Sequence, residues 1–249
     1  MIAVALGVGL LIAGLCRYTV WRLPSPAANP RVLMYHAFGD CVPEGMNPEL
    51  CVRPRAFERQ VALLKRRGYT FLTVSELLGR GDLTKCVALT FDDGFADNAE
   101  VALPVLRAHQ AKATVFVSQK SDVRGARMLS GEQLRALAAD PLIELGAHTL
   151  NHVNLSQAEA AVAEAEVAGG KAYVEAFTGR ACVSFAYPYG RFTEGTVALL
   201  GRLGFTSAVT VKKGFAPLTD PYRIRRTSVL RSCDGLQFRV LLRCGRYRV

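Results

Sequence analysis

Carboxylates and imidazoles gather at two points of the sequence where apolar runs end. Asp92 and Asp93 follow one such run, and His148 and His152 follow another. Two adjacent carboxylates are costly to keep ionised in a partly buried place unless a cation lies nearby. Two imidazoles and one carboxylate form a three-ligand set with a position left for water, as in catalytic zinc sites. The four residues therefore indicate a metal site that activates water.

Each pair also has a simpler interpretation. Histidines four residues apart can lie on the exposed first turn of a helix, and an aspartate before a glycine, as in Asp93-Gly94, can be a turn or a helix cap. The spacing from His148 to His152 also lacks the glutamate of the metalloprotease motif, so it is a weak signal on its own. The choice depends on the elements that carry these residues.

Strand patterns and helix patterns alternate along most of the chain. We expect strands at 31–36, 69–73, 86–91, 112–118, 142–147, 182–187, 207–211 and 224–230, and helices at 54–68, 74–79, 98–110, 130–139, 156–178 and 193–204. The helix at 130–139 starts with a capping-box pattern, because Gln133 stands three residues after Ser130. This alternation predicts an α/β fold with a parallel sheet or barrel.

In such folds the chemistry lies at the carboxyl ends of the strands. Besides the aspartate and histidine pairs, His36 ends the first expected strand, and Pro188-Tyr189 follows the strand at 182–187. Four strand ends with unusual polar or aromatic residues would then meet at one rim. This coincidence favours a shared metal-dependent site over separate turns and surface histidines.

The motifs at this rim resemble those of the polysaccharide deacetylase family, which is carbohydrate esterase family 4 or the chitooligosaccharide-deacetylase (NodB) homology domain. The matching segments are TFDDG at 90–94, HTLNH at 148–152 and FAYPYG at 185–190, and the segments MYH at 34–36 and FERQ at 57–60 resemble the exopolysaccharide-type branch. The resemblance covers roughly residues 31–230. It implies a distorted (β/α) barrel and the metal-dependent removal of N-acetyl groups from amino-sugar glycans.

The resemblance also implies a role for each motif residue. Asp93, His148 and His152 would hold one divalent metal ion, with zinc as the first choice and cobalt or nickel as alternatives. Asp92 would be the general base, because a metal lowers the pKa of water toward about 7 and the carboxylate then takes the proton. The oxyanion would rest on the metal and on a backbone N–H, most simply that of Tyr189.

The segment Tyr187-Pro188-Tyr189 is a candidate for substrate binding. Its two tyrosines could form an aromatic wall for a sugar ring, and ordinary packing at the rim is the alternative.

The sequence departs from the family pattern at two points. Ala186 stands where the family often has an arginine that orients the base, so Arg226 is the expected replacement and Arg191 the second choice. Either arginine can instead be solvated. The late Leu-x-His that serves as general acid is absent, so His36 is the expected acid, with a protonated water on the metal or Asp92 itself as alternatives.

Composition excludes several classes of protein. Half of the 249 residues are hydrophobic and 21% are charged, which excludes a disordered chain and a coiled coil. The net charge is +10, but residues 222–249 hold eight arginines and one acid, so the rest is close to neutral and a nucleic-acid-coating protein is excluded. Seven cysteines without a C-x-x-C pair exclude a zinc ribbon. Cys41 with Cys51 and Cys233 with Cys244 are candidate disulfides, and reduced thiols are the alternative.

We divide the chain into four segments. Residues 1–23 are expected to anchor the protein in a membrane, with a cleaved signal peptide as the alternative; residues 24–30 form a Pro-rich linker; residues 31–230 form the deacetylase domain; and residues 231–249 form a basic amphipathic tail. The tail either lies on an anionic membrane or packs on the barrel. The resemblance places the domain in the periplasm or outside the cell, whereas the arginines after the apolar run favour the cytoplasm.

The leading hypothesis is thus a membrane-anchored, metal-dependent deacetylase of an N-acetylated glycan. One alternative is an amidohydrolase of the same fold that acts on a lipid-linked sugar or a small amide. Another is a non-catalytic glycan-binding module, although intact Asp92, Asp93, His148 and His152 argue against lost activity. The expected partners are the glycan and a membrane, and no nucleic acid; the oligomeric state stays open.

Overall fold

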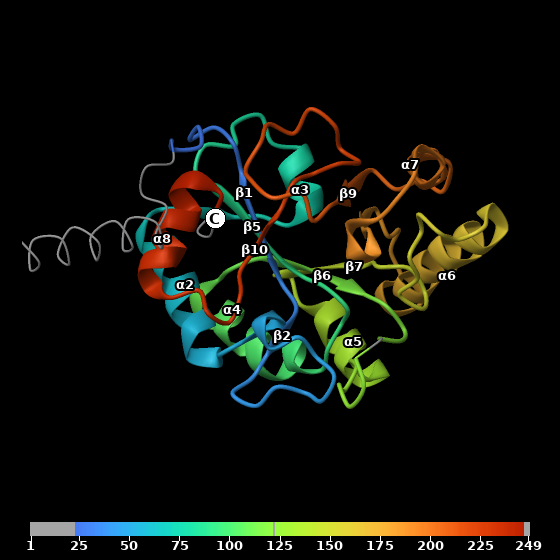
Figure 1. Ribbon diagram of the computed structural model, residues 1–249, viewed down its shortest axis with the longest axis horizontal. Helices are drawn as coiled ribbons and strands as arrows, with labels where there is room; N and C mark the ends of the chain where they lie inside the picture. The colour runs from blue at the N-terminus through green and yellow to red at the C-terminus, as the bar shows by residue number, and fades with distance from the viewer. Residues whose placement is uncertain (1–22, 122, 247–249) are drawn as a thin grey trace, which may run out of the picture.

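A curled sheet of parallel strands runs through the molecule, with helices packed around it (Figure 1). The computed structural model describes residues 23–121 and 123–246. The strands follow the order β10-β1-β5-β6-β7-β8-β9, with β4 beside β5, and each of these pairs is parallel. The expected α/β fold with a parallel sheet is therefore confirmed.

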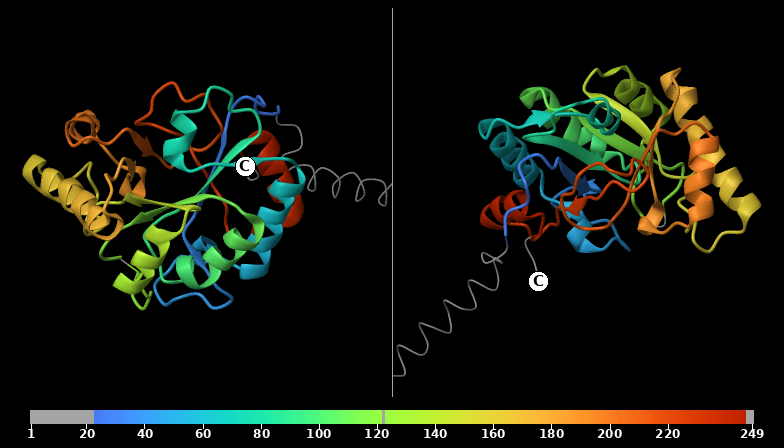
Figure 2. Two further views of the ribbon diagram at one scale, coloured as in Figure 1. Left: turned by 180° about the vertical axis from the view of Figure 1, so that it is seen from behind. Right: turned by 90° about the horizontal axis from the view of Figure 1, so that it is seen from above.

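The strands of this sheet are β1 (Arg31–Tyr35), β4 (Thr70–Phe71), β5 (Cys86–Phe91), β6 (Ala113–Val117), β7 (Ile143–Ala147), β8 (Ser184–Ala186), β9 (Ser207–Val209) and β10 (Thr227–Ser228), and β2 (Ala37–Phe38) pairs separately with β3 (Cys51–Val52). The helices are α2 (Pro54–Arg66), α3 (Val74–Leu78), α4 (Leu103–His109), α5 (Gly131–Ala139), α6 (Ala160–Thr178), α7 (Glu194–Arg202) and α8 (Gly235–Cys244), with short turns η1 (Pro48–Leu50), η2 (Asn98–Ala102) and η3 (Pro188–Gly190). In both views of Figure 2, α6 and α7 lie at the opposite end of the molecule from α8.

Two helix starts show how local hydrogen bonds decide a boundary. Ser130 caps α5, and its capping box with Gln133 is present as expected. The helix expected from Ser156 begins instead at Ala160, because the N–H and the hydroxyl of Ser156 both bind Oδ1 of Asn154 in a preceding turn. A short polar side chain can thus satisfy a local turn rather than a helix cap.

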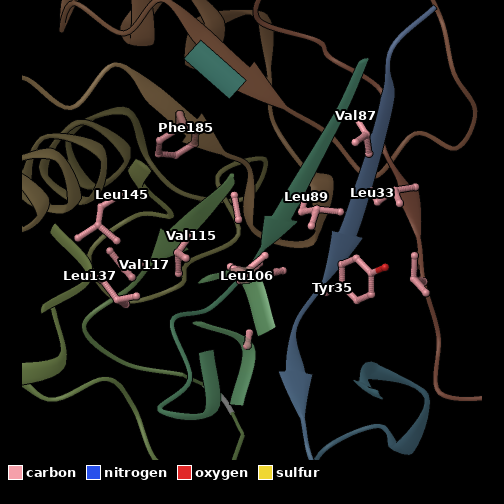
Figure 3. Close-up of a cluster of buried hydrophobic side chains, with 14 of the residues drawn as sticks. Leu33, Tyr35, Val87, Leu89, Leu106, Val115, Val117, Leu137, Leu145 and Phe185 are labelled. Carbon is pink, nitrogen blue, oxygen red and sulfur yellow. The ribbon is translucent and has the colours of Figure 1, made fainter. Parts of the chain in front are cut away.

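The main core lies between the sheet and the helices that cover it (Figure 3). Leu33 of β1, Leu89 of β5 and Val115 of β6 are fully buried there, and they meet Leu106 of α4 and Leu137 of α5 within one cluster. Burial of each such side chain contributes about 1.5–3 kcal/mol. The ends of these strands are therefore held in place by a buried core.

The carboxyl-terminal helix packs on the domain. Phe238 and Leu241 of α8 are buried, and the helix contacts α2. The packing alternative for the tail therefore holds for residues 235–244, and residues 247–249 lie outside the described part. A disulfide between Cys233 and Cys244 is excluded because they stand at the two ends of α8, whose ten residues span about 15 Å. Cys41 and Cys51 are free thiols.

The membrane anchor expected at residues 1–23 lies almost wholly outside the described residues. Within residues 23–121 and 123–246, no helix is both long and apolar enough to cross a membrane.

Candidate active site

Four strands end at one edge of the sheet. The pairing registers place Tyr35 of β1 beside Phe91 of β5, and Ala147 of β7 beside Phe185 of β8, all in parallel strands. β6 joins the two pairs, because Val117 lies opposite Ala147. The residue after each strand therefore leaves the sheet on the same side, and the common rim expected from the sequence is confirmed.

Asp93, His148 and His152 meet at this rim. Their ligand atoms all lie within 4.8 Å of one another. Oδ1 of Asp93 is 3.4 Å from Nε2 of His148 and 3.3 Å from Nε2 of His152. The two histidines belong to a loop rather than to the helical turn that their spacing suggested, and backbone φ angles of 58° at Thr149 and at His152 fold that loop.

The loop that carries the histidines is anchored by α6. Glu166 accepts hydrogen bonds from the backbone N–H and the side-chain amide of Asn151, at 2.8 and 2.7 Å. Thr149 also lies directly on Gly170 of α6, where an added Cβ would stand 2.7 Å from the carbonyl carbon of Thr149. Close approach of the loop to the helix thus requires a glycine at this position.

This donor set is consistent with a divalent metal ion. Nδ1 of His148 lies 2.8 Å from the carbonyl oxygen of Ala186, which can only accept, so Nδ1 carries the proton and Nε2 presents its lone pair. Burial would raise the pKa of Asp93, but the contacts of this carboxylate with His148 and His152 outweigh burial and lower that pKa. An ionised carboxylate beside two imidazole nitrogens is a usual zinc ligand set.

Asp92 stands beside the triad and is held by Arg226. The guanidinium donates to both carboxylate oxygens, at 2.6 and 2.7 Å, and both side chains are almost completely buried. Burial alone would raise the pKa of Asp92, but the charge and hydrogen bonds of Arg226 outweigh it, so the pKa is lowered. Arg226, the expected replacement for the arginine that the family often has at the position of Ala186, therefore binds Asp92. The second choice, Arg191, is exposed.

His36 follows β1 and is half-buried near both carboxylates. Its electrostatic interaction with Asp92 and Asp93 helps to lower the pKa of both carboxyl groups. Its backbone carbonyl accepts a hydrogen bond of 2.9 Å from the side-chain amide of Asn98. The rim thus includes the residue expected from the sequence to be the acid.

The two tyrosines of the 187–189 segment take different places. Tyr189 is 49% exposed, has a φ of 59°, and packs its ring 4.7 Å from the ring of His152. Tyr187 is fully buried, stacks on Phe192 and donates its hydroxyl to the carbonyl of Tyr222. The expected aromatic wall is therefore wrong for Tyr187.

Pro188 cannot offer its ring to a substrate either, since its side chain is buried at the start of η3. Both residues instead shape the turn that presents Tyr189.

The sequence analysis predicted no role for two residues of the site, Thr90 and Asn98. Thr90 accepts a 3.0 Å hydrogen bond from Arg226, and its hydroxyl donates a hydrogen bond to the carbonyl of Leu33. Asn98 is 1% exposed and holds the segment that bears His36. The sequence signal for Asn98 was its place four residues after the TFDDG segment, whereas Thr90 looks like one more strand residue.

Comparisons with known proteins agree with this geometry. The profile of the family described as polysaccharide deacetylase matches residues 80–208. The deacetylase PplD from Streptococcus pyogenes, solved with acetate, is 30% identical, with a TM-score of 0.75 over 88% of this chain and 97% of that one. IcaB from Ammonifex degensii is 28% identical, with a TM-score of 0.75 over 89% of this chain and 98% of its own. YxkH from Bacillus subtilis, named as a polysaccharide deacetylase, is 28% identical over 226 residues, which cover 88% of this chain and 78% of YxkH.

Proposed function

The chain belongs to the polysaccharide deacetylase family, and we propose that it removes N-acetyl groups from an amino-sugar glycan with Asp92 as general base. It is an enzyme, a hydrolase of non-peptide carbon–nitrogen bonds. The observation that carries the proposal is the buried Asp92–Arg226 pair directly beside Asp93, His148 and His152. One carboxylate is thus available as a metal ligand and the other as a base.

The metal in this proposal is a single divalent ion, with zinc as the first choice. It would be held by Asp93, His148 and His152, and it would supply a Lewis acid that lowers the pKa of water and polarises the amide carbonyl. The hydrogen bond from Nδ1 of His148 to Ala186 supports this assignment, because it orients the imidazole and fixes its tautomer.

Asp92 would accept a proton from the attacking water. Its lowered pKa supports this role, since the carboxylate is then ionised at neutral pH. Arg226 would act as a positioning residue, because its two parallel hydrogen bonds fix the plane of the carboxylate. A base fixed in this way needs no rearrangement before it takes the proton.

The remaining roles fall to Tyr189 and His36. The backbone N–H of Tyr189 would stabilise the oxyanion, and the closeness of its ring to His152 supports this. The exposed ring would contact the sugar. His36 would return a proton to the leaving amine, which its position near the two carboxylates supports.

Metal content and acetate release together test the proposal. We expect about one divalent ion per chain by elemental analysis, and loss of this ion in a His148→Ala/His152→Ala variant. Wild-type enzyme should release acetate from chitotetraose, whereas Asp92→Asn should keep the ion and lose about 10²-fold to 10⁴-fold in kcat. Circular dichroism controls for folding. Full activity in Asp92→Asn would overturn the assignment of the base.

We also propose that residues 1–23 anchor the enzyme so that the domain faces the periplasm or the cell exterior. The apolar run of the sequence supports the anchor, and the glycan substrate supports the orientation. Protease added to intact spheroplasts should then digest the domain. A fully protected domain would place it in the cytoplasm instead.

A further inference from the structure

A cavity of about 600 Å³ adjoins the active site on the side of Tyr189. Gly190, Thr210, Val211 and Lys212 are among the residues that line it. Two residues of its wall accept hydrogen bonds from Arg226, the partner of Asp92. Nε of Arg226 donates to the carbonyl of Thr210 at 2.9 Å, and the backbone N–H of Arg226 donates to the carbonyl of Lys212 at 3.2 Å.

The wall of the cavity is also fixed in relation to Tyr189. Gly190 has a φ of 65°, and an added Cβ there would stand only 2.2 Å from Cγ2 of Val211. The turn after Tyr189 therefore packs against the strand end that leads to Lys212. Tyr189, whose ring lies beside His152, and Val211 of the cavity wall are both exposed, at 49% and 38%.

The charges that line the cavity do not cancel. Arg223 is neutralised, because its guanidinium binds Asp220 at 2.7 Å and Glu194 at 2.5 Å. Lys212 and Arg225 are exposed cavity residues. In the described part of the chain, neither side chain has a hydrogen bond or an ion pair. Two cations thus remain available to a ligand in the cavity.

We propose that this cavity binds an anionic group, a carboxylate or a phosphate, carried by the glycan next to the acetamido sugar that is deacetylated. The inference rests on the proposed function, since it takes Tyr189 as the contact of the reacting sugar. An aromatic and aliphatic surface suits the apolar face of a sugar ring, and the two cations beyond it suit an anion. The substrate class is therefore an acidic N-acetylated glycan.

Matched substrates isolate the charge. The carboxylate arm compares a tetrasaccharide of alternating N-acetylglucosamine and glucuronate with its carboxyl-reduced derivative. The phosphate arm compares chitotriose 1-phosphate with chitotriose. In at least one arm, full-length wild-type enzyme should show a kcat/KM about fivefold to tenfold higher for the anionic member, as expected for two partly solvated cations. The arm with the preference identifies the anion.

The variant Lys212→Gln/Arg225→Gln should bring this ratio close to one. Arg59→Gln/Arg66→Gln removes two exposed arginines of α2 that line a different cavity, and it is the matched control, which should keep the wild-type ratio. Raising sodium chloride from 0.05 to 0.5 M should narrow the wild-type ratio, because salt screens exposed charges. Equal kcat/KM for the anionic and the neutral member of both substrate pairs would overturn the inference. A preference for the anionic member that survives Lys212→Gln/Arg225→Gln would also overturn it.

Equilibrium binding separates this inference from the proposed function. The dissociation constants are measured on full-length protein whose metal has been removed by chelation, so that no turnover interferes. A preference for the anionic ligand that requires Lys212 and Arg225 supports the cavity, even if no substrate releases acetate, and the proposed function alone then fails. Acetate release without any preference in binding or in kcat/KM supports the proposed function and refutes the cavity.

Discussion

Two arginines are buried within the described residues, and they bind different kinds of acceptor. Arg226, directly before β10, binds the carboxylate of Asp92. Arg31, at the start of β1, donates only to backbone carbonyls, at 3.1 Å to Leu242 and at 2.8 Å to Pro26 among others. The guanidinium thus has a charged acceptor in one case and neutral acceptors in the other.

The two arginines therefore have different roles: Arg31 stabilises the fold, whereas Arg226 affects the protonation of a site residue. The acceptor Leu242 lies in the last turn of α8, where the helix dipole favours a cation, so Arg31 ties the linker to the helix end. Arg226 instead controls the protonation of its partner, because a guanidinium beside a buried carboxylate keeps the charged form stable. Only the second arrangement keeps a buried carboxylate ionised, as the proposed base requires.

The largest effect is expected for Arg226→Met. The variant leaves Asp92 buried without its cation, which costs about 3–5 kcal/mol of stability. Burial then dominates and raises the pKa of Asp92, so the acid limb of the kcat/KM profile should move to higher pH. We expect kcat to fall by about 10²-fold or more, within the range for general-base catalysis. Urea unfolding and a pH–rate profile measure the two effects.

A double variant is the control for this experiment. Asp92→Asn/Arg226→Met removes both charges and should recover most of the lost stability, but none of the activity. An acid limb that stays in place in Arg226→Met would show that Arg226 is structural in the same sense as Arg31.

A smaller effect is expected for Arg31→Met, and on stability alone. Carbonyls that Arg31 binds, including those of Asn29 and Leu242, would lose a buried donor. We expect a loss of about 2–4 kcal/mol in the free energy of unfolding. The kcat/KM per folded molecule and its pH profile should not change. Arg31→Lys should restore only part of the stability, because an ammonium lacks the planar fork. A shifted pH profile in Arg31→Met would mean that Arg31 also affects the protonation of the site.

Much of the rim could be predicted because its residues follow directly on apolar runs. The ends of β5 and β7 are clear from the sequence, which therefore predicts that Asp92, Asp93, His148 and His152 lie at one edge. Arg226 was also expected from its place at the start of the last strand. It contacts Asp92 although the two are 134 residues apart in the chain.

The errors have local physical causes. Tyr187 looks like a rim residue in the sequence, but β8 ends at Ala186 and the next side chain turns into the core. The available cations Lys212 and Arg225 lie in irregular segments, where no periodicity indicates which side chains share a cavity. Local sequence patterns do not predict which loops, far apart in the chain, contact each other.

The smallest effect is expected for Asp97→Asn, which tests a half-buried carboxyl group on which Arg127 acts only through its charge. Asp97 accepts hydrogen bonds from the backbone of Phe38 and from Asn98, and burial raises its pKa to about 7. Asp92 and Asp97 thus have opposite pKa shifts, and we attribute the difference to Arg226. The folded protein keeps the proton of Asp97 up to about pH 7, whereas a carboxyl with the ordinary pKa of 3.8 loses it much earlier.

Stability is therefore lost as the pH rises from about 4 to about 7, because the folded state binds the extra proton in that range. Asn keeps an acceptor oxygen for Phe38 and cannot ionise, so Asp97→Asn should stabilise the protein by about 1–2 kcal/mol at pH 8.5 and change it little at pH 4. For a chain of this size that corresponds to a rise of roughly 2–8 °C in Tm. Thermal unfolding of both proteins from pH 4 to 9 measures the gap. If the two curves of Tm against pH run parallel across that range, burial does not raise the pKa of Asp97. The comparison with Asp92 would then no longer isolate the contribution of Arg226.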